Sequence, residues 1–329
     1  MSAPVFRDPI FDGATDPVVI ARDGTDEWWM FYTQRRPEDP GPGVRWVHGT
    51  RIGTAVSTDQ GASWRYRGTA SGLEEGNTLW APEVVRSPQG YRMYLTVVDG
   101  IPSSWSDAEA HIVEYLSDDL EHWSRRGRIE LGSDRVIDAA VEHCADGRWR
   151  LWYKNERDGS STWAATSADL QQWSVEGRVV PAEPPHEGPN VFRLGGWYWL
   201  LTDEWRGLGV HRSIDGARWT RQDAAGGLIL NEPGRHPLDR QLGRHADAVV
   251  LDSTRAVLFY FTHTAAAEGE DRWLDAVASR RSAVHVAQLR VFEGRLVADR
   301  DVPAGRPLVA RNEACPLTEV EPSETEGTA

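Results

Sequence analysis

The sequence predicts an all-β protein that folds as a single five-bladed β-propeller. Three observations indicate this fold: a short turn that ends in tryptophan recurs four times, a pair of apolar runs precedes each turn, and no segment shows the period of a helix. Units of roughly 40 to 50 residues with four strands each are typical of propeller blades. A two-sheet sandwich is the alternative, but it would not repeat the turn in phase with the strands.

The recurring turn has a serine, an aspartate two positions later and a tryptophan at its end. Its four copies are residues 57–64, 117–123, 167–173 and 213–219. An aspartate side chain accepts the backbone N–H groups that close such a turn. We expect the tryptophan to pack the outer strand onto its neighbour.

Apolar runs rich in strand-forming residues pair across short polar hairpins in all five units. The pairs are 18–20 with 28–32, 84–85 with 91–95, 139–141 with 149–153, 191–192 with 197–200, and 248–251 with 256–260. A third strand follows the pair, for example at 52–56, 112–116 and 284–291, and a fourth comes after the tryptophan turn.

These units predict one propeller domain in residues 1–310, with its blades between 6 and 303. Residues 311–329 are acidic and are predicted to form a disordered tail. Long insertions rich in glycine, proline and charged residues are expected to be loops, some of them at the rim of a binding site. They lie at 34–51, 99–110, 231–244 and 264–282.

Composition limits the partners and the location. The net charge of -14 and the pI of about 5.2 argue against nucleic acid or an anionic membrane as a partner. No apolar stretch has the length of a signal peptide or a membrane span, which favours a cytoplasmic protein. Cys144 and Cys315 lack the spacing of metal ligands or of a disulfide framework. The oligomeric state is not predicted.

Two residue types are unusual in number. The sixteen tryptophans indicate a repeated packing position, a sugar-stacking pocket, or both. Lys154 is the chain's only lysine among 36 basic residues. We interpret this bias as the base composition of the gene rather than as the sign of a site.

The first strand of every propeller blade lines the central channel, so residues at matching starts of these strands are expected to face one another. The residues at these positions are Asp16, Glu83, Asp138, Glu187 and His245, with Asp247 close behind. The alternative is that the acids only cap the strand starts. Four converging carboxylates would repel one another unless their pKa values are shifted or a cation is bound.

Five short motifs carry a resemblance to a known family. They are Thr15-Asp16-Pro17, Trp80-Ala81-Pro82-Glu83, Ile137-Asp138, His186-Glu187-Gly188-Pro189 and Gly243-Arg244-His245. In these motifs the chain resembles the five-bladed propeller glycoside hydrolases of family 43, the arabinosidase, xylosidase and arabinanase group. Each motif is short, but the five occur in the family's order, one in each blade.

The resemblance implies roles for the channel residues. Asp16 matches the general base that activates water, Asp138 the acid that tunes the pKa and orients the proton donor, and Glu187 the general acid. His245 matches a channel histidine that in many members contacts a bound calcium ion or its water. No cofactor is expected to be required, and calcium is the ion that the resemblance implies for the channel.

The implied activity is inverting hydrolysis of a short oligosaccharide or glycoside, of the α-L-arabinofuranosidase or β-xylosidase kind. Crowded negative charge is expected to raise the pKa of one carboxyl group, and Glu187 is the natural candidate. The residues expected to contact the sugar are Trp80, Glu83, Arg244, His245 and Trp205. Further aromatic side chains in or beside the rim loops are Trp46, Trp105 and Trp273.

The chain departs from the family pattern in two motifs. The family usually has aspartate where Glu83 stands, and Asp-Pro where this chain has Asp138-Ala139. A second Asp-Pro, at Asp8, is a rival for the base. Asp16 is preferred because its strand and hairpin are in phase with those of the other blades.

Two other classes of function stay open. One is a related carbohydrate enzyme: a retaining fructosidase-like hydrolase, an anhydro-galactosidase or a phosphorylase. The fructosidase pattern has asparagine and cysteine where Thr15 and Gly188 stand, and a phosphorylase needs a basic pocket. The other class is a sugar-binding propeller without activity, which would be expected to lack Asp16 or Glu187.

Overall fold

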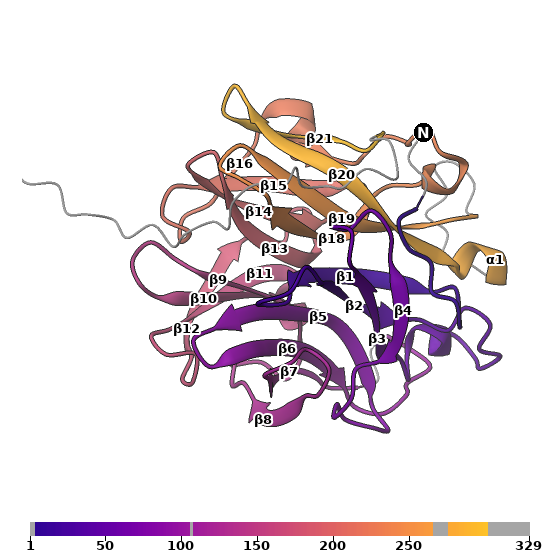
Figure 1. Cartoon of the computed structure of the whole chain (residues 1–329). Coiled ribbons are helices and arrows are strands. Elements are labelled where there is room, and N and C mark those ends of the chain that lie inside the picture. The colour runs from indigo at the N-terminus through magenta and orange to yellow at the C-terminus, as the bar shows by residue number, and fades with distance from the viewer. Residues whose placement is uncertain (1–3, 106–107, 266–275, 302–329) are drawn as a thin grey trace, which may run out of the picture.

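The computed structural model describes residues 4–105, 108–265 and 276–301. Within these ranges the strands form five antiparallel sheets, which are arranged as the blades of a propeller (Figure 1). The predicted all-β, five-bladed fold is therefore confirmed. The predicted domain limit at residue 310 and the acidic tail lie outside the described residues.

Each blade is one continuous segment of the chain. The first two blades are β1 (Ala14–Ala21), β2 (Trp28–Gln34), β3 (Arg51–Ser57) and β4 (Arg65–Thr69), then β5 (Thr78–Ser87), β6 (Gly90–Val98), β7 (Ala110–Ser117) and β8 (Ser124–Arg128). The third is β9 (Val136–His143), β10 (Trp149–Asn155), β11 (Ser161–Ser167) and β12 (Ser174–Val180).

The fourth blade has a fifth, short strand, because β17 pairs with β15 beside β16. Its strands are β13 (Glu187–Leu194), β14 (Trp197–Asp203), β15 (Leu208–Ser213), β16 (Thr220–Arg221) and β17 (Leu228–Ile229). The fifth blade is β18 (Arg244–Val250), β19 (Arg255–His263), β20 (Ser282–Phe292) and β21 (Arg295–Asp299).

Helical pieces are short and lie in the connections. They are the 3-10 turns η1 (Arg45–Val47), η2 (Glu156–Asp158), η3 (Ala224–Gly227) and η4 (Pro237–Asp239), and the single turn α1 (Val277–Arg280). Among the described residues, no helix has the length and apolar character that would let it cross a membrane.

The tryptophan turns join neighbouring blades. Their aspartates accept backbone N–H bonds as predicted; Asp119 Oδ1, for example, accepts from Glu121 N and His122 N, each at 2.8 Å. Each tryptophan, however, packs edge-on against the second strand of the preceding blade, at centroid distances of 5.6–6.0 Å. The pairs are Trp64 with Phe259, Trp123 with Phe31, Trp173 with Tyr94, and Trp219 with Trp152.

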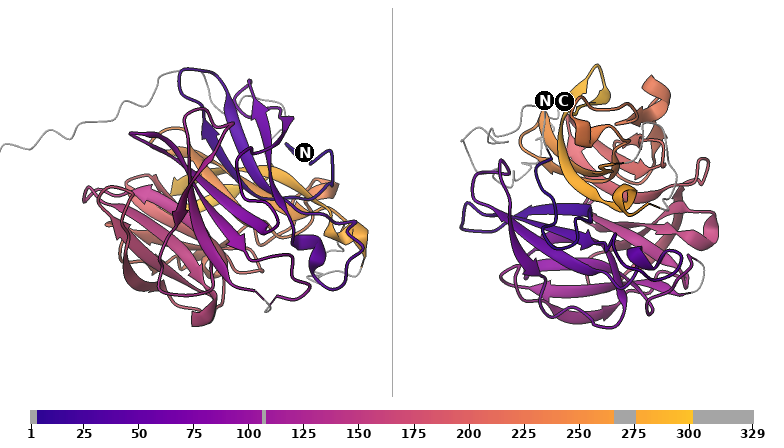
Figure 2. Two further views of the ribbon diagram at one scale, coloured as in Figure 1. Left: turned by 90° about the horizontal axis from the view of Figure 1, so that it is seen from below. Right: turned by 90° about the vertical axis from the view of Figure 1, so that its right-hand side faces the viewer.

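The hydrophobic core lies between the blades rather than within them. Five buried clusters each combine apolar residues of two consecutive blades, and one of them joins the fifth blade to the first. At that seam Trp64 packs on Phe259, and Phe6 forms an antiparallel bridge with Val284. Figure 2 shows the indigo first blade beside the yellow last strands. The burial of these apolar faces fixes the blades around the channel.

The five inner strands share one irregularity. At the same level, β1, β5, β9, β13 and β18 each shift register against the second strand of their blade. In four of these bulges one residue has a positive φ: Asp16 at 51°, Ala81 at 42°, Asp138 at 56° and Gly188 at 56°. A bulge re-aims the side chain that it contains. This level is where the polar residues of the channel converge.

Candidate active site

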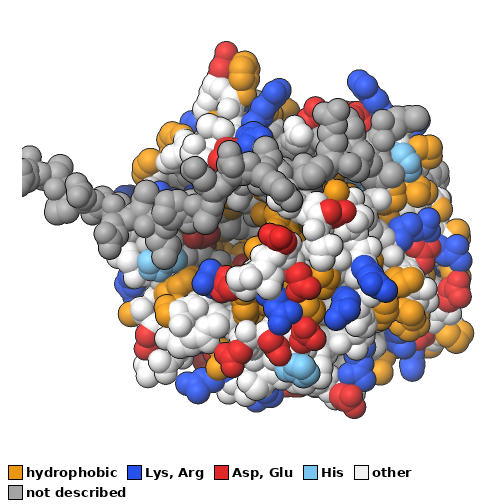
Figure 3. All heavy atoms as spheres, in the orientation of Figure 1, with side chains coloured by type: hydrophobic (Ala, Val, Ile, Leu, Met, Phe, Trp, Pro, Cys, Tyr) orange, Lys and Arg blue, Asp and Glu red, His pale blue; other side chains and the backbone are white. Residues whose placement is uncertain are grey.

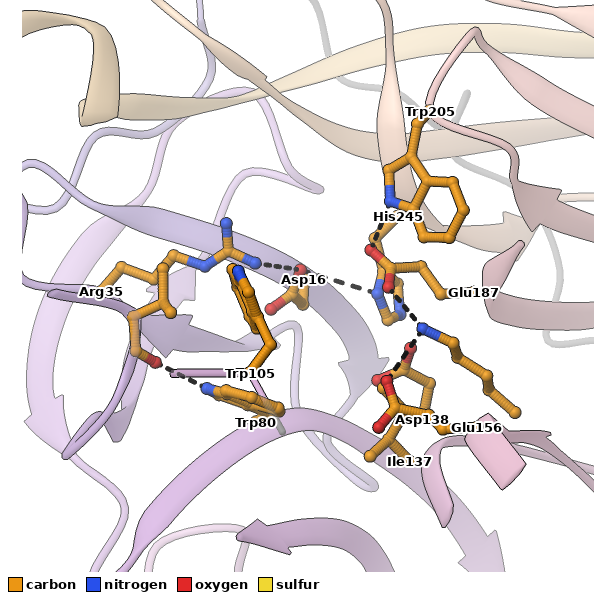
Figure 4. A pocket seen from close by; sticks show the side chains of 12 residues that line it. Asp16, Arg35, Trp80, Trp105, Ile137, Asp138, Glu156, Glu187, Trp205 and His245 are labelled. Carbon is orange, nitrogen blue, oxygen red and sulfur yellow. Dashed lines mark hydrogen bonds and ion pairs between the residues drawn. The ribbon is translucent and has the colours of Figure 1, made fainter. Parts of the chain in front are cut away.

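A cavity of about 580 Å³ opens at the level of the bulges (Figure 4). Twelve residues line it: Asp16, Arg35, Val47, Trp80, Trp105, Ile137, Asp138, Lys154, Glu156, Glu187, Trp205 and His245. The structure therefore brings together the three predicted catalytic residues and three of the five predicted sugar-contact residues, Trp80, Trp205 and His245. Strands of all five blades contribute to the lining.

Glu83 and Arg244 do not line this cavity. Glu83 stands two residues beyond the bulge of its strand, at the register position of Asn190 and Asp247 in other blades. With these two residues it borders a separate hollow of about 340 Å³ formed by the inner strands. Glu83 therefore lies beside Asp247 as predicted, but our prediction that it faces Asp16, Asp138 and Glu187 was wrong, because the bulge separates the two levels. Arg244 is buried, and its positive charge acts on Asp203.

Asp16 is held by two cationic side chains. Its Oδ1 lies 3.6 Å from Arg35 Nη2 and 3.6 Å from His245 Nδ1, and Thr15 Oγ1 donates a hydrogen bond to Oδ2 at 3.1 Å. The Arg35 guanidinium is itself placed over the Phe261 ring, 5.3 Å from its centroid. Two contacts from opposite sides fix the direction of this carboxylate, as a positioned base requires.

The rival base, Asp8, has a structural role. It is buried, and its carboxylate accepts hydrogen bonds from the Tyr32 hydroxyl, from Gln34 Nε2 at 2.7 Å and from two backbone N–H groups. It does not line the cavity. Of the two Asp-Pro motifs, the one at Asp16 therefore belongs to the site.

Glu187 is paired with a lysine. Lys154 Nζ donates to its Oε2 at 3.1 Å, and Trp205 Nε1 donates to its Oε1 at 3.1 Å. Burial raises the pKa of Glu187, but the Lys154 ammonium, with His245 and the Trp205 N–H, outweighs burial and brings the pKa to about 2. The expectation that charge crowding raises the pKa of Glu187 was wrong, because the lysine beside it had not been recognised.

The carboxyl group with the raised pKa is Asp138. Burial, together with the negative charges of Glu187 and Asp16, raises its pKa to about 7 despite the nearby His245 and Lys154. Its Oδ2 accepts a hydrogen bond from Gly188 N at 3.0 Å. Asp138 therefore touches the backbone next to Glu187 and is the group that retains a proton near neutral pH.

Gly188 makes room for His245. A Cβ at this glycine would lie 2.8 Å from the His245 ring, and its φ of 56° disfavours any other residue. Asp203 Oδ2 accepts from the backbone N of His245 at 3.1 Å. Burial lowers the pKa of His245, but the surrounding carboxylates, first Asp138 and then Asp16, raise it above its usual value. The histidine is thus a further positive group at the centre of the site.

Aromatic rings form one wall of the cavity. Trp80 Nε1 donates to Val47 O at 2.7 Å, and the His48 ring centroid lies 4.9 Å from that of Trp80 and 5.8 Å from that of Trp105. Figure 4 shows Trp80 and Trp105 on the Asp16 side and Trp205 on the Glu187 side. Of the other predicted rim aromatics, Trp46 is buried and Trp273 lies outside the described residues.

Sequence reasoning missed three charged residues of the site. Arg35 directly follows β2 and begins the first long insertion, Lys154 lies in β10, and Glu156 begins η2. One signal was available, because the only lysine of the chain is unusual in itself. Interpreting the arginine bias as base composition alone was wrong for this position.

The arrangement can transfer protons on two sides of a bound ligand. Asp16 and Glu187 come from the first and fourth blades and enter the same cavity, where Asp138 adds a proton-bearing group beside Glu187. Paired carboxyl groups with different pKa values are what hydrolysis of a glycosidic bond requires. Fold and site together are those of the propeller glycoside hydrolases.

Sequence comparison gives the family. The chain belongs to the glycosyl hydrolases family 43, whose sequence pattern matches residues 6–268. The family predicted from the motifs is therefore confirmed, and the protein is a glycoside hydrolase. A comparison with curated protein sequences gave no match.

Solved structures show the same fold at low identity. A thermostable family-43 glycoside hydrolase is 16% identical with a TM-score of 0.64, over 92% of this chain and 99% of that chain. A family 43 β-xylosidase/α-arabinofuranosidase from a compost microbial metagenome, in complex with xylotriose, is 13% identical with a TM-score of 0.64, over 92% and 97%. A family 43 β-1,3-galactosidase with galactodeoxynojirimycin is 15% identical with a TM-score of 0.63, over 91% and 97%.

Proposed function

We propose that this protein hydrolyses the glycosidic bond of a short oligosaccharide or small glycoside with inversion at the anomeric carbon. The observation that carries the proposal is the meeting of Asp16, Asp138 and Glu187 in one cavity with separate partners. Asp16 is the general base and Glu187 the general acid. Asp138 is the third carboxyl group and influences the protonation of Glu187.

The reaction has two proton transfers, one from the attacking water and one to the leaving oxygen. Asp16 takes a proton from the water that attacks the anomeric carbon, while Glu187 gives a proton to the leaving oxygen. Inverting glycosidases hold the two carboxyl groups about 6.5–9.5 Å apart so that a water molecule fits. Arg35 and His245 support this role for Asp16, because they direct its carboxylate into the cavity.

An α-L-arabinofuranoside or a β-xyloside is the substrate that we propose. The volume of about 580 Å³ lies in the range of sites for small ligands and suits a short glycoside. The family includes enzymes for these sugars, as in the β-xylosidase/α-arabinofuranosidase structure above. Trp80 and Trp105 offer ring faces for sugar C–H groups.

We further propose that catalysis does not require calcium. Calcium is bound by six to eight oxygen ligands, whereas His245 and Asp16 are already paired with each other and with Arg35. Among the described residues, no three His, Cys, Asp or Glu side chains are grouped as they would be round a metal ion. Direct coordination of calcium by these side chains is therefore not proposed, and the contact of His245 with calcium through water stays a prediction from the resemblance.

Nucleic acid and membranes are not proposed as partners. The face shown in Figure 3 carries acidic and basic side chains mixed together, and the chain as a whole has a net charge of -14. Phosphate backbones are bound by clustered positive charge. The cytoplasmic location stays a prediction from the sequence.

A panel of 4-nitrophenyl glycosides (α-L-arabinofuranoside, β-D-xyloside, β-D-galactoside and α-L-fucoside) tests the activity, with Asp16→Asn as the blank and Glu187→Gln as the variant that lacks the proton donor. We expect one of the pentosides to be hydrolysed best. On the corresponding disaccharide, which has a poor leaving group, the variant should lose about 10²–10⁴-fold in kcat. Proton NMR should show the inverted anomer first. A variant as active as wild type on the disaccharide, or a retained first anomer, contradicts the proposal.

A further inference from the structure

Lys154 lies between two carboxylates at the edge of the cavity. Its Nζ is 3.1 Å from Glu187 Oε2 and 3.2 Å from Glu156 Oε1, and it lies 5.4 Å from the centroid of the Trp205 ring. The side chain is only 4% exposed. Glu156 is held from behind by an ion pair with Arg135. The ammonium therefore has two alternative partners within reach, and only one of them is the proton donor.

The pairing with Glu187 conflicts with the proposed chemistry. A hydrogen bond from an ammonium stabilises the ionised form of a carboxyl group, so this contact opposes the protonation that a donor to the leaving oxygen needs. The second partner removes the difficulty, since Lys154 stays paired when it moves fully to Glu156. Binding of an anionic sugar substituent by Lys154 is not favoured, because two carboxylates already neutralise its charge.

We propose that Lys154 is a positioning residue for the proton donor. It holds the Glu187 carboxylate until a glycoside binds. When the glycoside binds, Lys154 moves to Glu156, which frees Glu187 to receive a proton. The inference rests on the proposed function of Glu187. A hydroxyl group beside the scissile bond is the feature of the ligand that would accept from the displaced ammonium. Lys154 thus makes proton donation depend on an occupied site.

The proton comes from within the site. Asp138 has a pKa of about 7, whereas that of Glu187 is about 2. When Lys154 leaves Glu187, the O–H bond on Asp138 breaks and an O–H bond forms on Glu187. The two carboxyl groups together carry the same charge before and after, so no proton has to be drawn from bulk solvent.

Charged groups from several elements face this pair. Lys154 faces Glu156 from η2, Asp138 from β9 and Glu187 from β13. Glu187 also faces His245 from β18. Burial, together with the negative charge of Glu187, raises the pKa of Asp203, at the end of β14. Of these groups Lys154 has the direct contact with the proton donor, so its removal is expected to raise the pKa of both Glu187 and Asp138.

Variants of the two ends of this ion pair give opposite shifts. In Lys154→Met the alkaline limb of the pH profile of kcat/KM should move to higher pH by about one unit or more, because the carboxyl pair keeps its proton to higher pH. In Glu156→Gln, which leaves Lys154 paired with Glu187 alone, the limb should move down and kcat should fall. Lys154→Arg keeps the charge and should keep the limb of wild type. A limb that stays fixed while Lys154→Met is slower by one factor at every pH overturns the proposal.

The single lysine permits a direct observation. Protein labelled with ¹⁵N at the lysine Nζ has one side-chain ammonium group to detect. In the inactive Asp16→Asn variant, adding the 4-nitrophenyl glycoside that wild type hydrolyses best should shift this resonance, and Glu156→Gln should abolish the shift. A resonance that saturating glycoside leaves unmoved contradicts the proposal. Failure of the proposed function itself is recognised separately, by a Glu187→Gln variant that stays active on the disaccharide.

Discussion

The channel has acidic residues at two levels, and their hydrogen-bond and ion-pair partners differ. At the level of the bulges, Asp16 and Glu187 have contacts with Arg35, Lys154 and His245. At the second level, two residues beyond Ala81 of β5 and His245 of β18, the acids bond neutral groups. Glu83 accepts from Val141 N, and Asp247 accepts from Val19 N and Asn190 Nδ2.

The pKa values follow this difference. Burial and the charge of Asp247 raise the pKa of Glu83 well above its usual value, and burial raises that of Asp247 to about 6. Glu187 is only half-buried, with its side chain 26% exposed, and Lys154 keeps its pKa low. Burial therefore favours the neutral form of a channel acid, and a cation partner favours its ionised form.

The largest contrast is expected between Asp16→Asn and Glu83→Gln. Loss of the general base should reduce kcat by about 10²–10⁴-fold. Glu83 does not line the cavity, so its variant should keep most of the wild-type kcat. Steady-state kinetics on the preferred glycoside measures both. Equal losses in the two variants would show that the two levels act as one site.

A substitution at the bulge should have the next largest effect. In Gly188→Ala the new Cβ would meet the His245 ring, so the base and its neighbours are displaced, with a loss on the order of 10²-fold in kcat/KM. Gly196→Ala in the same blade is the matched control. Gly196 also has a positive φ, of 82°, but a Cβ there has open space.

Both alanine variants should lose about 1–2 kcal/mol of stability from backbone strain. Only Gly188→Ala should lose activity. Thermal unfolding and kinetics on the same samples separate the two effects. If Gly196→Ala is equally inactive, the loss arises from strain in the blade and not from contact with His245.

The smallest effect is a pH dependence of stability at the Glu83 level. In the unfolded chain Glu83 ionises above about pH 4.3, whereas burial keeps it protonated to higher pH in the folded chain. Wild type therefore loses stability as the pH rises above 4.3, and Glu83→Gln has no such loss. The Tm of the variant relative to wild type should rise by about 2–4 °C between pH 4 and pH 7. A Tm difference that does not change with pH would contradict the neutral state of Glu83.

Repetition made the fold predictable. The tryptophan turns and the hairpins recur in phase, and this local pattern was enough to count the blades. The sequence predicted only that Trp64 and Trp123 contact a neighbouring strand. The structure shows that they pack against Phe259 and Phe31 of the preceding blades. Contacts between blades depend on how the ring closes, and the sequence of a single blade does not indicate how it closes.

The sequence predicted the charged site residues on the inner strands but not those on other elements. Asp16 and Asp138 stand at equivalent bulge positions and Glu187 stands one residue before its bulge, so blade counting finds all three near one level. Lys154 lies on a second strand and reaches the cavity from beside Glu187, which no repeated position indicates. Glu83 was misplaced because a bulge of one residue moves every later side chain of its strand to a new level.

The bulges also bear on how such an enzyme changes over generations. Asp16, Ala81, Asp138 and Gly188 occupy equivalent left-handed positions, and His245 holds the equivalent place in the fifth blade. This left-handed backbone is a platform that carries an acid in two blades, a methyl group in another and a hydrogen atom in a fourth. A mutation at one platform alters the chemistry while the sheets stay as they are. Ala81 holds an inert side chain in this backbone, and it is the position from which a lineage could acquire a new polar group without rebuilding the ring.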